Sequence, residues 1–164
     1  MRPYLLVDVD FVLNPDFSAV WDGSQGDGLR AAGWGTVGGF IMNDRPVWLN
    51  IHHGRDLLRV AYETGAELAW ATNWHHYANQ VVAPILGLPQ LPLATSPPRP
   101  KEQAVIEWTA GRPFVWLDDE NHVLAAIDAA PNGASVRIDP ATGLTDANLE
   151  EAMKRLARFR SESP

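Results

Sequence analysis

The chain has no cysteine among its 164 residues. Disulfides, thiolate metal sites and cysteine nucleophiles are therefore excluded, and the composition suits a reducing compartment. No apolar run approaches the roughly 20 residues that a membrane-spanning helix needs, and no apolar segment typical of a secretory signal precedes Asp8. We expect a soluble cytoplasmic protein that contacts no membrane.

Basic residues are also few. Thirteen Lys and Arg against 20 Asp and Glu leave a formal net charge of -7. This balance disfavours a surface that coats nucleic acid, because such a surface must neutralise many phosphates. It leaves room for a local basic pocket that holds a single phosphate.

Apolar runs that favour strands alternate along the chain with segments whose apolar residues recur at helical spacing. This alternation predicts an α/β fold in one domain spanning residues 1–164. We expect a three-layer, Rossmann-like parallel sheet of about five strands with helices on both faces. The strands are predicted at 4–9, 66–72, 90–95, 113–119 and 134–139, and the helices at 54–65, 78–89, 101–111, 121–130 and 145–159.

Punctuating residues mark several of these helices. Gly65 and Gly87 follow apolar helical patterns and are good helix stops. Pro84 predicts an interruption or kink within its segment. Thr145 is a plausible N-cap for the last helix.

Residues 14–50 break the alternation and form an insertion after the first strand. Their glycines, and two strand-like runs joined through the turn-prone "NDR", predict a small β-hairpin flap, or minimal cap, with irregular flanks. The segment is either a surface loop with its own apolar cluster or a functional lid. Trp21, Trp34 and Trp48 in or beside it could stack on a base, but packing of the flap onto the sheet is the favoured interpretation.

Carboxylates follow two of the predicted strands. Asp8 and Asp10 end the first strand, and Asp118 and Asp119 end the fourth. In open α/β sheets ligands bind at the carboxyl ends of the strands, so these four groups are expected to converge. They would repel one another unless a divalent cation lay among them, and an all-oxygen ligand set favours Mg²⁺.

Two further side chains complete a site for phosphoryl transfer. Thr72 ends the second strand and Lys101 begins the helix after the third, so a hydroxyl and an ammonium could hold phosphate oxygens. One carboxylate can then attack phosphorus while a second protonates the leaving group and later deprotonates water. Asp8 and Asp10 suit these two roles.

The order of these motifs, "DVDFVLN", "WATN", Lys101 and "WLDD", resembles the haloacid dehalogenase-like (HAD) superfamily over about residues 4–130. Most members are Mg²⁺-dependent phosphohydrolases. The resemblance implies an aspartyl-phosphate mechanism, with Asp119 favoured over Asp118 as the direct metal ligand. It assigns the site residues as follows: Asp8 nucleophile and metal ligand; Asp10 general acid and base, with its main-chain carbonyl on the metal; Thr72, Asn73 and Lys101 phosphate-binding; Asp118 and Asp119 metal-binding.

Two features depart from the pattern of the family. The last motif often has a further acid a few residues after the doublet, whereas here Glu120 follows at once, which could alter the metal affinity. Phe11 stands where the family usually has glycine, whose backbone angles a bulky residue resists, so we expect a different local turn. Phe11 keeps open an alternative function, that of a catalytically weakened phosphate-binding or interaction protein on the same scaffold.

The gaps between motifs bear on the substrate. Only 29 positions separate Thr72 from Lys101, which leaves no room for a cap domain there. An open site resembles those members that act on phosphorylated macromolecules, such as polynucleotide ends, and the "DD" doublet resembles polynucleotide phosphatases. A receiver module is disfavoured by motif order, since its phosphate-accepting Asp comes after its acidic pair. A true dehalogenase would not need the magnesium cluster.

Overall fold

A parallel sheet of four strands lies at the centre of the fold, and the computed structural model describes residues 1–17, 26–42 and 45–161. The strand order is β4-β1-β5-β6, so the first strand of the chain lies between two strands that follow much later. This arrangement confirms the predicted α/β class. The strands are β1 (Tyr4–Val7), β4 (Glu67–Trp70), β5 (Phe114–Asp118) and β6 (Gly133–Arg137).

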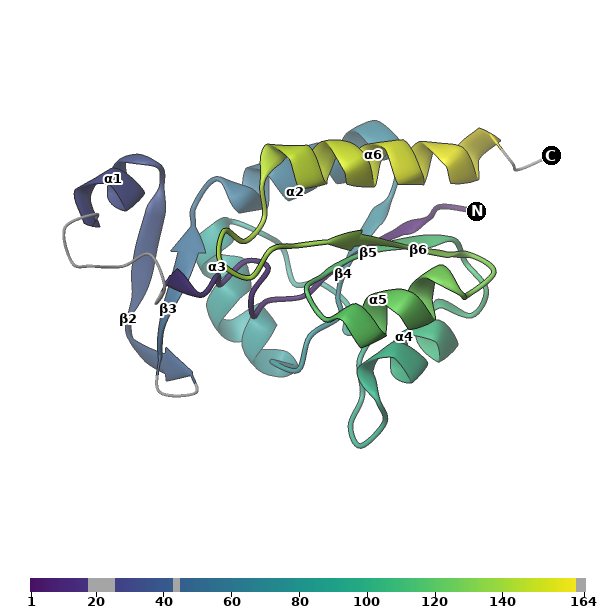
Figure 1. Ribbon diagram of the computed structural model, residues 1–164, viewed down its shortest axis with the longest axis horizontal. Coiled ribbons are helices and arrows are strands. Elements are labelled where there is room, and N and C mark those ends of the chain that lie inside the picture. The colour runs from purple at the N-terminus through teal and green to yellow at the C-terminus, as the bar shows by residue number, and fades with distance from the viewer. Residues whose placement is uncertain (18–25, 43–44, 162–164) are drawn as a thin grey trace.

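Helices cover both faces of the sheet, as the sequence predicted (Figure 1). Side chains alternate across β1, so Leu5 and Val7 pack in the core beneath α2 and α6, whereas Leu6 packs in the core beneath α4 and α5. Within the described ranges, no helix is long and apolar enough to cross a membrane. The helices are α2 (His53–Thr64), α4 (Lys101–Thr109), α5 (Asn121–Asp128) and α6 (Asp146–Ser161).

The predicted strand at 90–95 is reduced to one isolated bridge between Trp70 and Leu93. The Trp70 amide donates to the Pro92 carbonyl at 2.9 Å, and the Ala94 amide donates to the Trp70 carbonyl at 2.8 Å. Pro92 has no N–H with which to extend this ladder. Over the part of the chain described here, the sheet therefore has four strands instead of about five.

The helix predicted at 78–89 is interrupted, as its proline indicated. A π-helical turn at Ala78–Val82 leads into the short α3 at Ala83–Leu86, and Pro84 occupies its first turn. The segment stops at Gly87, whose φ of 67° is left-handed. The Gly65 stop of α2 has the same character, with φ 68°.

An antiparallel hairpin of β2 (Trp34–Met42) and β3 (Arg45–Asn50) occupies the second half of the insertion, preceded by the short helix α1 (Gly26–Ala31). Figure 1 shows the hairpin beyond one end of the sheet, away from both termini.

The hairpin packs through aromatic side chains. The Phe17 ring meets Trp34 and Trp48 edge-on, with centroids 5.1 and 5.8 Å apart. This contact agrees with packing as the role of these two tryptophans, and Trp21 lies outside the described residues.

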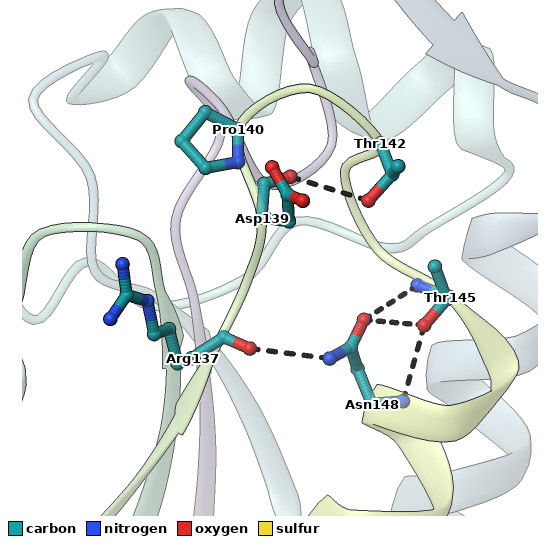
Figure 2. A pocket seen from close by; sticks show the side chains of 6 residues that line it. All are labelled: Arg137, Asp139, Pro140, Thr142, Thr145 and Asn148. Atoms are coloured by element: carbon teal, nitrogen blue, oxygen red, sulfur yellow. Dashed lines mark hydrogen bonds between the residues drawn. The ribbon is translucent and has the colours of Figure 1, made fainter.

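Thr145 caps α6, as its position suggested (Figure 2). Its hydroxyl accepts the Asn148 amide at 3.4 Å and donates to Asn148 Oδ1 at 2.6 Å, while its own amide donates to the same Oδ1 at 3.0 Å. Asn148 Nδ2 also donates to the Arg137 carbonyl at 3.2 Å. The cap therefore fastens the start of α6 to the end of β6.

Gly54 of α2 lies directly against the backbone of Leu86 in α3. A Cβ at this position would lie 1.8 Å from the Leu86 carbonyl oxygen, which is a backbone atom that cannot rotate away. We expect Gly54→Ala to lower the free energy of unfolding by about 1–3 kcal/mol, measured by urea denaturation. Gly28→Ala is the matched control, because a Cβ there meets nothing within 4 Å, and we expect it to leave stability unchanged or to raise it by up to about 1 kcal/mol, since alanine favours a helix over glycine. Equal effects of the two substitutions would contradict the packing argument.

Candidate active site

Strand register brings the predicted site residues together. Val7 pairs with Trp70 on one side and with Leu117 on the other, so β1, β4 and β5 end at the same level. Asp8 directly follows β1, Asp118 is the last residue of β5, and Thr72 follows β4 by two positions. All three side chains are buried at the carboxyl edge of the sheet, with exposures of 4%, 0% and 0%.

Lys101, the first residue of α4, places its ammonium among the carboxylates. Its Nζ lies 2.5 Å from Asp8 Oδ2, 2.8 Å from Asp118 Oδ2 and 3.2 Å from Glu120 Oε1. Glu120 is not among the site residues predicted from the sequence. Its only signal was its place directly after the acidic doublet, because the contact with Lys101 spans 19 residues and depends on the fold.

The pKa values of the three aspartates and of Lys101 all lie above their ordinary values, because of burial and of the charges around each group. Burial raises the pKa of Asp8 from 3.8 to about 7, with Lys101 opposing the shift and Asp118 adding to it. Burial likewise raises the pKa of Asp118, and it raises that of Asp119 to about 6. Burial by itself lowers the pKa of Lys101, but Asp8 and Asp118 outweigh it, so the net pKa lies above its ordinary value. The lysine stays charged and partly neutralises its neighbours.

Three of the four acids form a cluster that fits a hard divalent cation. One carboxylate oxygen from each of Asp8, Asp118 and Asp119 lies within 4.8 Å of the others. Two of these groups are buried, and the donors are all oxygen, which is the set that Mg²⁺ prefers. The residues present therefore fit the metal that the sequence analysis expected.

The carboxylate of Asp10 lies outside this cluster and has different partners. Its Oδ2 accepts the indole N–H of Trp74 at 2.9 Å, and its Oδ1 accepts the side-chain amide of Asn14 at 3.0 Å. Asp8 thus contacts the positively charged Lys101 ammonium, whereas the hydrogen-bond donors to Asp10 are neutral. The two acids have the separate environments that two different chemical roles require.

A pocket of about 210 Å³ opens onto these groups. Thr72 is fully buried and is not among the lining residues; its Oγ1 accepts the Trp74 amide at 3.3 Å, and its hydroxyl is close enough to Asp8 to lower the pKa of that carboxyl slightly. Asn73 is exposed at the rim. The residues lining the pocket are Asp8, Asp10, Phe11, Asn73, Lys101, Asp119 and Glu120.

Phe11 adopts a φ of 61°, in the left-handed region that favours glycine. The bulky residue therefore accepts the backbone angle that we expected it to resist. Its amide donates to the Asn14 carbonyl at 2.8 Å, which closes the turn after β1.

A second, smaller hollow of about 160 Å³ adjoins the pocket, sharing Asn73 and Lys101 with it. Its other lining residues are His75, Thr95, Ser96, Pro97, Pro98 and Arg99. A larger hollow of about 440 Å³ lies between the end of β6 and the start of α6 (Figure 2). There Thr145 and Asn148 bond each other as the helix cap, so the larger hollow is a structural feature of that junction.

The sequence matches one family of known proteins. A family model described as the HAD domain in Swiss Army Knife RNA repair proteins matches residues 4–149. A search of curated proteins gave no match.

Three solved structures resemble the chain in fold. A 3-deoxy-D-manno-octulosonate 8-phosphate phosphatase from Yersinia pestis is 17% identical, with TM-score 0.48, covering 98% of this chain and 83% of its own. The same enzyme from Moraxella catarrhalis, in complex with magnesium, phosphate and KDO, is 18% identical, with TM-score 0.49 and coverages of 98% and 92%. A structure from Legionella pneumophila described as a HAD superfamily (subfamily III A) hydrolase is 17% identical, with TM-score 0.45 and coverages of 96% and 81%.

Lys101→Met tests the charge balance of the site in metal-free buffer. Without the ammonium, Asp8 and Asp118 would remain buried without their cation, so we expect a loss of about 3–5 kcal/mol in the free energy of unfolding at pH 8. The lost cation raises both carboxyl pKa values further in the folded state. Folding then takes up protons, and the loss should shrink as the pH falls from 8 to 5.

The matched control is Lys154→Met, at an exposed position of α6. We expect it to change stability by less than about 0.5 kcal/mol at either pH. The readout is urea denaturation in the presence of EDTA. A loss for Lys101→Met that is the same at pH 5 and pH 8 would show that the buried charges are not its cause.

Proposed function

Because the chain belongs to the family of HAD domains found in Swiss Army Knife RNA repair proteins, we propose that it is a Mg²⁺-dependent phosphohydrolase that works through an aspartyl-phosphate on Asp8. One observation carries the proposal. Asp8, Asp118 and Asp119 form an oxygen cluster that fits a divalent cation, and the Lys101 ammonium lies 2.5 Å from the proposed nucleophile.

Asp8, Asp118 and Asp119 would hold the metal, together with the main-chain carbonyl of Asp10. When bound, Mg²⁺ supplies positive charge that stabilises the phosphoryl oxygens and lowers the repulsion between the phosphate and the acids. Lys101 adds positive charge to the same pocket. The Thr72 hydroxyl and the Asn73 amide are the neutral donors proposed for the remaining phosphate oxygens.

The reaction requires two displacements at phosphorus. In the first, an oxygen of Asp8 bonds to phosphorus, the bond to the leaving oxygen breaks, and Asp10 donates a proton to that oxygen. In the second, Asp10 takes a proton from water, the water oxygen bonds to phosphorus, and the bond to Asp8 breaks to release inorganic phosphate. Asp10 ends protonated, ready for the next cycle.

A polynucleotide end is the substrate that we propose. The pocket of about 210 Å³ accommodates a phosphoryl group, and the adjoining hollow offers the hydroxyl of Ser96 and the guanidinium of Arg99. A second phosphate, one nucleotide along the strand, would meet these donors. The segment between β4 and α4 contributes no cap domain over the site, and the description of the family refers to RNA repair.

Asp8→Asn should abolish turnover, because an amide does not attack phosphorus. We expect a fall of at least about 10³-fold in kcat for an aryl phosphate in the presence of Mg²⁺. Asp10→Asn should reduce kcat for an alkyl phosphate by about 10²–10⁴-fold, since it removes the proton donor. Circular dichroism checks that both variants fold. Wild-type protein that folds and binds Mg²⁺ and phosphate but turns over no phosphorylated substrate would be the non-catalytic phosphate-binding protein instead.

Arg99 should set a preference for a longer substrate. We expect kcat/KM for a phosphorylated dinucleotide to exceed that for the mononucleotide, and Arg99→Gln to reduce this preference about 3- to 10-fold, as removal of one exposed cation should. Turnover of an aryl phosphate should not change, because that substrate does not reach the second hollow.

Arg59→Gln is the matched control for Arg99→Gln. Both arginines are exposed and paired with a glutamate, Arg99 with Glu107 and Arg59 with Glu63. Arg59 lies on α2, outside both hollows. If wild-type protein has the same kcat/KM for the dinucleotide and the mononucleotide, a polynucleotide end is not the substrate. The phosphohydrolase proposal would still stand.

A further inference from the structure

Both oxygens of Asp10 are engaged by N–H donors that come from different parts of the chain. Trp74 follows β4 and reaches Oδ2 across 64 residues at 2.9 Å. Asn14 lies four residues after Asp10 and reaches Oδ1 at 3.0 Å. A carboxylate oxygen has two lone pairs and can accept two hydrogen bonds. One acceptor position therefore remains on each oxygen of Asp10 for a proton or a water.

The two donors are themselves held rigidly. Trp74 is only 3% exposed, and its amide bonds Thr72 Oγ1 at 3.3 Å. Asn14 is 6% exposed, and its Oδ1 accepts the amide of Trp48 in β3 at 2.8 Å. Asp10 is thus tied to the β4 loop through Trp74 and to the hairpin through Asn14.

We propose that Trp74 and Asn14 are positioning residues that fix the orientation of the Asp10 carboxyl for proton transfer to the leaving oxygen. The inference rests on the proposed function, since it assigns a purpose to contacts around the proposed general acid. A carboxyl group held at both oxygens cannot rotate freely, so less orientational freedom is lost on reaching the transition state. The hairpin then contributes to catalysis through the Asn14–Trp48 bond, at a distance from the reacting atoms.

The dependence of the rate on the leaving group distinguishes a positioning role of Trp74 and Asn14 from a purely structural one. A leaving oxygen of high basicity needs the proton from Asp10, whereas a good aryl leaving group departs almost without it. The ratio kcat/KM reports the first displacement, in which that proton moves. A positioning defect should therefore slow an alkyl phosphate and spare p-nitrophenyl phosphate.

The decisive variant is Trp74→Phe, which keeps a buried aromatic ring but removes the indole N–H together with part of the indole, so the loss of ring volume needs a control of the same kind. We expect kcat/KM for an alkyl phosphate to fall about 10-fold, the effect of one lost hydrogen bond, and that for p-nitrophenyl phosphate to change by less than about twofold. Asn14→Ala should show the same selectivity. An equal fall with both substrates, or no fall with the alkyl phosphate, would overturn the proposal.

Trp70→Phe is the matched control. Trp70 is also fully buried, and its indole N–H also donates to a side chain, Asn79 Oδ1, at 2.9 Å. Because that bond does not involve Asp10, Trp70→Phe should change kcat/KM by the same factor for the alkyl phosphate and for p-nitrophenyl phosphate.

A second measurement keeps the positioning proposal separate from the proposed function. The indole N–H signal of Trp74, identified by its loss in Trp74→Phe, should shift in the NMR spectrum of Asp10→Ala, while the Trp70 signal should stay in place. If wild-type protein hydrolyses neither substrate but the signal shifts, the proposed function fails while the contact stands. A Trp74 signal that is unchanged in Asp10→Ala would overturn the positioning proposal whatever the activity.

Discussion

The ammonium of Lys101, buried between the carboxylates of Asp8 and Asp118, is the contact on which the site depends. Each acid is withdrawn from water by its place at the end of a central strand, and burial of a charge is costly unless an opposite charge is close. The lysine supplies that charge across 93 residues of sequence. The proposed reaction uses this same cation for a second purpose, the binding of phosphate.

Much of the site could be predicted because its chemistry is encoded at the ends of apolar runs. Asp8 and Asp118 directly follow segments whose β-branched and aromatic residues favour buried strands, and a parallel sheet brings such ends to one edge. The contacts of Asp10 could not be predicted in the same way. Its bond to Trp74 depends on how the loop after β4 turns back over the sheet, and no local pattern in either segment encodes that path.

The errors in the sequence analysis have local physical causes. The run at 90–95 looks strand-like, but Pro92 removes the N–H that a further ladder bond would need, so pairing stops at a single bridge. Phe11 takes a left-handed backbone because the hydrogen bond from its amide to the Asn14 carbonyl closes the turn after β1. In both cases hydrogen bonding of the main chain outweighed the preference read from side-chain type.

The central position of β1 also has a consequence for the order of folding. This strand is translated before its neighbours β4 and β5, which begin 63 and 110 residues later, at Glu67 and Phe114 against Tyr4. While the ribosome is still adding those residues, the nascent strand has apolar side chains and two edges of unpaired N–H and C=O groups, a combination that promotes misassembly. The sheet cannot close, and the cluster of Asp8, Asp118 and Asp119 cannot form, until the acidic doublet after β5 has left the exit tunnel. A chain truncated before Asp118 should therefore be a client of chaperones that bind exposed strands.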